Sequence, residues 1–114
     1  MLKKEVLRTK SDFSLIYRTG KSVGDRYVVL FFKKNGLDYN RTAFLASKKV
    51  GNSVRRNRAR RLMRESWRKI CESLPIGYDF IIIARNTIND RRFQEVSASL
   101  NHAIQRSRLK EQVK

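Results

Sequence analysis

Ten basic side chains are crowded into the segment from Lys48 to Lys69, and only Glu65 opposes them. Arg and Lys bind phosphate groups, and the guanidinium group of Arg can do so through two parallel hydrogen bonds. The 114-residue chain carries 27 Lys and Arg against 10 Asp and Glu, a formal net charge of +17, which is typical of nucleic-acid-binding domains. The basic residues of the segment are Lys48, Lys49, Arg55, Arg56, Arg58, Arg60, Arg61, Arg64, Arg68 and Lys69.

A helix is predicted over residues 54–73, because apolar side chains recur there with helical spacing. The apolar stripe consists of Ala59, Leu62, Met63, Trp67, Ile70, Cys71 and Leu74. The side of the helix opposite this stripe carries Asn57, Arg61, Arg64 and Arg68, and these four are flanked by Arg58 and Arg60. The first turn, near the positive end of the helix dipole, carries Arg55 and Arg56. This pattern predicts a nucleic-acid-binding face. A merely solvated basic face is the first alternative. A membrane-lying helix is the second, and it is disfavoured because the apolar stripe is needed for the core.

Aromatic residues suggest a second binding element. Phe13 and Tyr17 share one face of a short predicted helix, and Tyr27 and Phe31 share one face of a predicted strand. Exposed rings beside a basic helix would form a stacking platform for unpaired bases. The alternative is that most of these rings belong to the core.

The sequence offers no arrangement that predicts catalysis by the polypeptide. The ten carboxylates are scattered, with no D-x-D or H-x-E pairing, His102 is alone, and no zinc spacing is present. Cys71 falls in the apolar stripe, where an inert thiol is expected. We therefore predict no catalytic residue and no metal ligand in the protein itself. The polypeptide is expected to position a substrate that another component cuts.

The predicted elements follow in the order αββ–α–β–α, which indicates an α+β fold with helices packed on a sheet. A helix over 13–18, capped by Ser11 or Asp12 and ended by Gly20, precedes a strand over 26–33. A second strand over 41–47 is predicted antiparallel to the first. Gly51-Asn52-Ser53 offers an N-cap for the basic helix, residues 78–85 form a buried central strand, and Asn89 caps a last helix.

The length fits a single domain over 1–114, with loose ends expected at 1–10 and 107–114. No apolar run approaches the roughly 18 residues of a membrane helix, and no secretory signal is recognised. A single cysteine fits a reducing compartment, so we expect a cytoplasmic protein.

The segment from Ser47 to Glu65 (SKKVGNSVRRNRARRLMRE) resembles the RNR signature of the bacterial ribonuclease P protein component. Asp12-Phe13, Tyr17 and Gly20 resemble the first helix of that family, and the strand from Tyr78 to Arg85 its last strand. The resemblance implies an α–β sandwich with a small, mainly antiparallel sheet and a left-handed βαβ crossover, although the general rule favours the right hand.

The resemblance also implies a function. In this family a large RNA is the catalyst, and the protein binds it one-to-one and helps to hold precursor tRNA while the 5′ leader is removed. Mg²⁺ bound mainly by RNA and substrate serves the chemistry. The resemblance implies, by position, that RNA is contacted by Lys48, Lys49, Asn52, Arg56, Asn57, Arg58, Arg60, Arg61 and Arg64. It implies that the cleft for the single-stranded leader is lined by Phe13, Tyr17 and Phe31. Arg55 and Tyr17 depart from the common residues at their positions. A ribosomal or ribosome-assembly RNA-binding protein and an autonomous nuclease remain alternatives.

Overall fold

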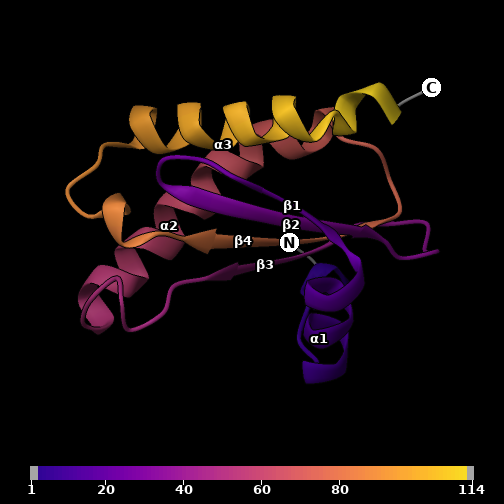
Figure 1. The fold of residues 1–114 in the computed structure, drawn as a ribbon, viewed down its shortest axis with the longest axis horizontal. Helices are drawn as coiled ribbons and strands as arrows, with labels where there is room; N and C mark the ends of the chain where they lie inside the picture. Colours follow the sequence, from indigo (N-terminus) through magenta and orange to yellow (C-terminus); the bar gives the residue numbers. More distant parts are fainter. Residues whose placement is uncertain (1–2, 113–114) are drawn as a thin grey trace.

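The computed structural model describes residues 3–112, in which three α-helices are arranged around a twisted sheet (Figure 1). The helices are α1 (Lys10–Thr19), α2 (Ser53–Ile70) and α3 (Phe93–Ser107), and the strands are β1 (Lys21–Gly24), β2 (Val28–Lys34), β3 (Arg41–Leu45) and β4 (Tyr78–Ala84). Four short 3₁₀ helices complete the described chain: η1 (Lys3–Glu5), η2 (Cys71–Ser73), η3 (Asn86–Ile88) and η4 (Leu109–Gln112). The α+β class is confirmed.

The sheet has the strand order β1-β2-β4-β3. The pairs β1–β2 and β2–β4 are antiparallel, whereas β3 and β4 are parallel and connected through α2. The predicted central strand is therefore confirmed as β4, in which six of seven residues are buried. β3 runs antiparallel to β2 in direction, as predicted, but it is not its neighbour. β4 lies between them because a strand buried on both faces needs a hydrogen-bonding partner at each edge.

The two faces of the sheet are covered differently (Figure 1). On one side α2 and α3 close a large core that includes Leu30, Phe80 and Leu100. On the other side a smaller cluster forms around Ile16 and Ile81, to which α1 and the N-terminal segment contribute. We call this second side the open face. Along β2 the side chains alternate between buried and half-buried, as the two-residue period of a strand requires.

Two of the three predicted helix caps differ in the structure. Thr9, not Ser11 or Asp12, caps α1, because its hydroxyl accepts the Asp12 backbone N–H at 3.2 Å. The predicted N-cap of α2 is confirmed, since Asn52 accepts the Arg55 N–H at 3.0 Å. α3 begins after Arg92, where the Glu95 carboxylate accepts the Arg92 N–H at 3.1 Å. Asn89 instead donates to the carbonyl of Val50 at 2.6 Å, which ties the loop before α3 to the loop before α2.

The prediction of loose ends is wrong for the part of them that the structure describes. Leu7 is 3% exposed and its N–H donates to the carbonyl of Thr42 at 3.1 Å, and Leu109 is 1% exposed. Both segments dock because each brings an apolar side chain to a core cluster. The outermost residues of the predicted loose ends, 1–2 and 113–114, lie outside the described residues. None of the helices within residues 3–112 combines the length and the apolarity that crossing a membrane requires.

Candidate nucleic-acid interface

One side of α2 anchors the helix to the sheet. Trp67 is 3% exposed and its ring meets that of Phe80 edge-on, with centroids 4.8 Å apart. Ser66, which the apolar stripe did not predict, is also buried and donates its hydroxyl to the carbonyl of Leu62 at 2.8 Å. Ala59, Leu62, Met63, Trp67, Ile70 and Leu74 are all buried as predicted, while Cys71 is half-buried.

The opposite side of α2 faces solvent. Asn57, Arg61, Arg64 and Arg68 are exposed, and Arg58 and Arg60 flank them half-buried, as the helical period predicts. We call these six residues the basic face. Lys48, Lys49 and Asn52 precede the helix and are exposed, Arg55 is exposed in the first turn, and Arg56 beside it is half-buried.

Within the described part of the chain, no ion pair takes its cation from the basic face. The ion pairs found there are Arg41 with Asp12 and Asp79, Arg91 with Glu95, Arg106 with Asp25, and Arg108 with Glu111. None of them takes its cation from α2. Like charges three or four residues apart on a helix repel each other, so a bound polyanion would relieve the repulsion.

Two members of the basic face are held in position by hydrogen bonds. Arg58 donates through Nη2 to the carbonyl of Arg91 at 2.6 Å, and Arg60 donates through Nη1 to Oδ1 of Asn57 at 2.9 Å. These bonds leave both guanidinium charges in place, because neither acceptor is a carboxylate. Ordered guanidinium groups lose less conformational entropy when a phosphate binds.

Three of the four aromatic residues predicted for the second binding element come together on the open face. The rings of Phe13 and Tyr17 on α1 stack with centroids 6.4 Å apart and an interplanar angle of 27°. The ring of Phe31 on β2 meets Tyr17 edge-on at 5.0 Å. We call these three residues the aromatic cluster. Tyr17 is its most accessible member at 44% exposure, and burial of part of its ring raises the pKa of the phenol.

Tyr27 does not join the aromatic cluster, although the alternation of the predicted strand placed it on the same face as Phe31. Because β2 begins only at Val28, the alternation does not extend back to this residue. Tyr27 packs instead against the core under α2 and α3, and the guanidinium of Arg91 lies 5.7 Å from its ring centroid.

A groove of about 510 Å³ connects the basic face with the aromatic cluster. Arg64 and Arg68 border it on α2, Phe13 borders it on α1, and Phe44 lies between them on β3. The guanidinium of Arg64 is 5.7 Å from the centroid of Phe44. The sequence shows Phe44 as one of several aromatic residues near the basic helix, but only the folded chain shows that it lies against Arg64 and borders the groove. A strand of nucleic acid in the groove would meet cations on one side and apolar and ring surface on the other.

Arg41 bridges a buried carboxylate of the sheet and a carboxylate of α1. Asp79 is 5% exposed, and Arg41 reaches its two carboxylate oxygens at 2.8 and 2.7 Å. The hydrogen bond to Asp79 raises the pKa of Arg41, which also contacts Asp12 of α1 at 3.3 Å. Sequence reasoning missed this bridge. An acidic residue inside the apolar run YDFIIIA was the available signal, because a buried carboxylate needs a partner.

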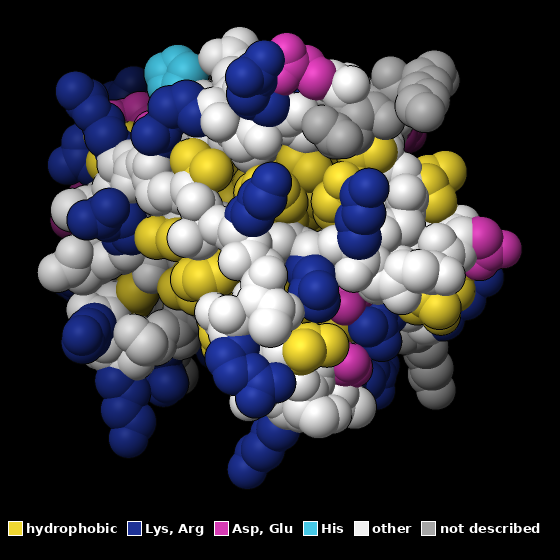
Figure 2. Space-filling model, turned by 45° about the vertical axis from the view of Figure 1, so that its right-hand side comes forward, with side chains coloured by type: hydrophobic (Ala, Val, Ile, Leu, Met, Phe, Trp, Pro, Cys, Tyr) yellow, Lys and Arg dark blue, Asp and Glu magenta, His cyan; other side chains and the backbone are white. Residues whose placement is uncertain are grey.

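Basic side chains are also frequent on the side of the molecule drawn in Figure 2. Figure 2 shows one side of the molecule, where Lys and Arg side chains surround hydrophobic patches and few acidic side chains are visible. Among residues 3–112, no three side chains of His, Cys, Asp or Glu come together as ligands for a metal ion. His102 is exposed, and burial raises the pKa of the Cys71 thiol, as expected for an unreactive cysteine.

Comparison with known proteins finds relatives of one kind. A family model described as ribonuclease P matches residues 1–108. The ribonuclease P protein component of Pelotomaculum thermopropionicum is 41% identical over 105 residues, covering 92% of this chain and 94% of that protein. That of Clostridioides difficile is 39% identical over 102 residues, covering 89% and 90%.

Solved structures of the same kind share the fold. The RNase P protein of Staphylococcus aureus superposes with a TM-score of 0.82 at 32% identity, covering 92% of this chain and 96% of that one. The RNase P protein of Thermotoga maritima gives 0.78 at 33% identity, covering 96% and 99%. The shared fold extends over both the basic face and the aromatic cluster.

Proposed function

Because the chain belongs to the ribonuclease P protein family, we propose that it is the protein subunit of a ribonucleoprotein that removes the 5′ leader from precursor tRNA. In this proposal the RNA partner performs the cleavage, and the protein binds both that RNA and the substrate in the cytoplasm. One observation carries the proposal: the basic face, whose cations form no ion pair with described residues, opens through a groove onto the aromatic cluster.

The basic face binds the catalytic RNA in a one-to-one complex. Its guanidinium groups contact phosphates, and Lys48, Lys49, Asn52, Arg55 and Arg56 extend this contact around the N-terminal end of α2. Contacts to the phosphate backbone dominate the affinity of such complexes and make it depend on salt. Binding also lowers the concentration of Mg²⁺ that the folded RNA needs, because the protein supplies part of the neutralising charge.

The aromatic cluster binds the single-stranded leader. An unpaired base can stack on the accessible ring of Tyr17, and Phe13 and Phe31 hold that ring in position. Stacking is tolerant of sequence, because every base has a π-face. The mature tRNA has no leader, so this contact would distinguish the substrate from the product.

The cleavage itself is hydrolysis of a phosphodiester. Water attacks phosphorus, the bond to the 3′ oxygen of the leader breaks, and the mature tRNA keeps a 5′ phosphate. Mg²⁺ held mainly by RNA and substrate would activate the water and stabilise the leaving oxygen. The scattered carboxylates of residues 3–112 offer no shared site for such an ion, so the protein contributes binding and orientation.

Reconstitution tests the proposal. The purified protein is mixed with ribonuclease P RNA and precursor tRNA at a Mg²⁺ concentration too low for the RNA alone to act. We expect the protein to restore 5′ cleavage, and we expect treatment of the complex with a nuclease that destroys the RNA to abolish it. Failure to stimulate cleavage would favour an rRNA-binding role. Cleavage by the protein free of RNA would contradict the assignment of catalysis to the RNA.

A further inference from the structure

A second group of cations lies at the β1 edge of the sheet, away from α2. Lys21 on β1 and Lys33 and Lys34 on β2 border a pocket of about 300 Å³, closed by Thr19 at the end of α1 and by Leu109 of η4. We call it the lysine pocket. No Asp or Glu lines it, and neither the lysine pocket nor any of its three lysines is used by the contacts described above.

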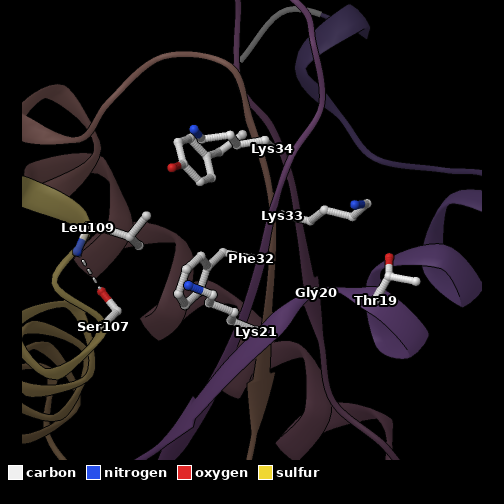
Figure 3. Close-up of a pocket in the computed structure, with 9 residues that line it drawn as sticks. Thr19, Gly20, Lys21, Phe32, Lys33, Lys34, Ser107 and Leu109 are labelled. Carbon is white, nitrogen blue, oxygen red and sulfur yellow. Dashed lines mark hydrogen bonds between the residues drawn. The ribbon is translucent and has the colours of Figure 1, made fainter. Parts of the chain in front are cut away.

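The three lysines approach the pocket from both sides of β2. In Figure 3, Lys33 extends toward Thr19 and α1, whereas Lys21 and Lys34 extend to the opposite side, toward Ser107 and Leu109. The pocket therefore wraps around the sheet edge instead of belonging to one face. Its floor includes the ring of Phe32, which is 7% exposed.

The charges of the lysine pocket are available to a ligand. No ion pair between described residues involves Lys21, Lys33 or Lys34. Asp79 on β4 lies directly opposite Lys33 in the pairing of β2 with β4. Both of its oxygens are occupied by Arg41, so it does not neutralise the lysine.

The lysine pocket continues the path that begins at the basic face. The groove runs from Arg64 past Phe44 to Phe13, and Phe13 stacks on Tyr17, which meets Phe31. Lys33 follows Phe31 by two residues on the same side of β2, so it lies about 7 Å further along the strand. Along this path the cations of α2 are followed by the rings of the open face and then by Lys33. Lys21 and Lys34 lie beyond Lys33, on the other side of β2 (Figure 3).

The length of the path fits a single strand. Three steps between neighbouring strands, from β3 to β1, span about 14 Å. Stacked nucleotides rise about 3.4 Å each, so a strand that crosses the sheet covers about four of them.

We propose that the lysine pocket binds the phosphodiester backbone of the leader upstream of the nucleotides that stack on the aromatic cluster. This inference rests on the proposed function and extends it, because it assigns a second contact to the same leader. It predicts that the affinity of the complex for precursor tRNA depends on the length of the leader. A short leader that ends at the rings does not reach the lysines, whereas a leader that is several nucleotides longer does.

The test uses the reconstituted complex of protein and ribonuclease P RNA with two precursor tRNAs, one with the short and one with the long leader. The variant K21Q/K33Q/K34Q is compared with the wild type. We expect the wild type to bind the long-leader substrate several-fold more tightly than the short-leader one, and we expect the variant to bind both equally. The slope of log affinity against log salt for the long leader should fall by about two, since each single-strand phosphate contact contributes about 0.7.

A matched control removes the same charge from the other end of the sheet. Arg26, Arg85 and Arg92 are exposed there, and R26Q/R85Q/R92Q should keep the dependence on leader length. If half-buried Lys33 proves necessary for folding, K21Q/K34Q changes only exposed side chains and should remove most of the effect.

The possible outcomes separate the two proposals. Undiminished length dependence in the lysine variant would overturn the lysine pocket as a leader site, while leaving the proposed function intact. Equal weakening of both substrates and of the RNA partner alone would assign the lysines to the catalytic RNA and would also overturn this inference. A wild-type complex that does not distinguish precursor from mature tRNA would instead contradict the leader-binding part of the proposed function.

Discussion

The basic face and the aromatic cluster are suited to different parts of RNA, phosphates and bases, and they are assembled from different numbers of secondary-structure elements. The basic face lies on one helix, and its side chains repeat with the period of that helix. The aromatic cluster joins two residues of α1 to a third on β2, and an ion pair through Arg41 keeps α1 against the sheet. Charge acts over a distance and tolerates small displacements, whereas ring stacking requires contact. The comparison teaches that the charged surface needs only a helix, but the stacking surface needs the tertiary fold.

Mutations in the two surfaces should also have different effects on RNA binding. Loss of a cation weakens binding to any RNA and lowers the dependence on salt, because the contact is to phosphate. Loss of a ring weakens only the ligand whose bases stack there. Mutations that separate the two kinds of effect therefore test whether the division of roles is real.

The largest effect is expected from the basic face. Arg61→Ala combined with Arg64→Ala removes two exposed charges from adjoining turns. Affinity for the catalytic RNA should fall by about tenfold or more, and the salt slope should decrease by about 1.8. Relief of the repulsion should leave the free energy of unfolding unchanged or raise it by a few tenths of a kcal/mol. Filter binding over a salt series and thermal denaturation measure the two quantities. Unaltered RNA affinity in a folded variant would show that α2 is not the main contact.

A smaller and more selective effect is expected from the aromatic cluster. Phe13→Ala should weaken binding of precursor tRNA by about 1–3 kcal/mol. It should leave mature tRNA and the catalytic RNA nearly unaffected, because neither has a leader on the rings. Leu15→Ala is the matched control, since Leu15 lies on the same helix and is 41% exposed without belonging to the cluster. Equal losses for precursor and mature tRNA would contradict the leader role.

A still smaller effect is expected from the ion pair between Arg41 and Asp12, which holds α1 against the sheet. Asp12→Asn removes the charge of one partner of Arg41 but keeps the Arg41–Asp79 pair. The Arg41–Asp12 pair is partly solvent-exposed, so its loss should lower the free energy of unfolding by only about 0.2–1 kcal/mol. Discrimination between precursor and mature tRNA should decrease by less than in Phe13→Ala, while RNA affinity stays constant. A decrease as large as that of Phe13→Ala would mean that α1 depends on this contact for its position.

The smallest effect is expected from pH. Burial raises the pKa of Tyr17 above its usual 10.0, so its phenol stays neutral to still higher pH. Affinity for precursor tRNA should therefore be flat from about pH 6 to about pH 9, measured at constant salt and Mg²⁺. Tyr17→Phe should have the same flat profile. A transition in that range that Tyr17→Phe abolishes would contradict a neutral phenol.

The sequence alone determined the basic face almost completely. The positions of Arg61, Arg64 and Arg68 opposite Trp67 follow from the helical period, and the cap at Asn52 follows from local chemistry. The buried central strand was equally predictable, since YDFIIIA is a nearly continuous apolar run. These features depend on residues that are close together in the chain.

The tertiary structure decided the features that depend on distant residues. Only the fold inserts β4 between β2 and β3, which orients the groove, and only the fold brings Arg41 to both Asp12 and Asp79. The grouping of Phe31 with Tyr17 and the exclusion of Tyr27 likewise depend on where β2 begins. Local periodicity assigns a side chain to a face, but the packing of whole elements decides which faces meet. That is why charge on one helix could be foreseen from the sequence, whereas the groove and the lysine pocket could not.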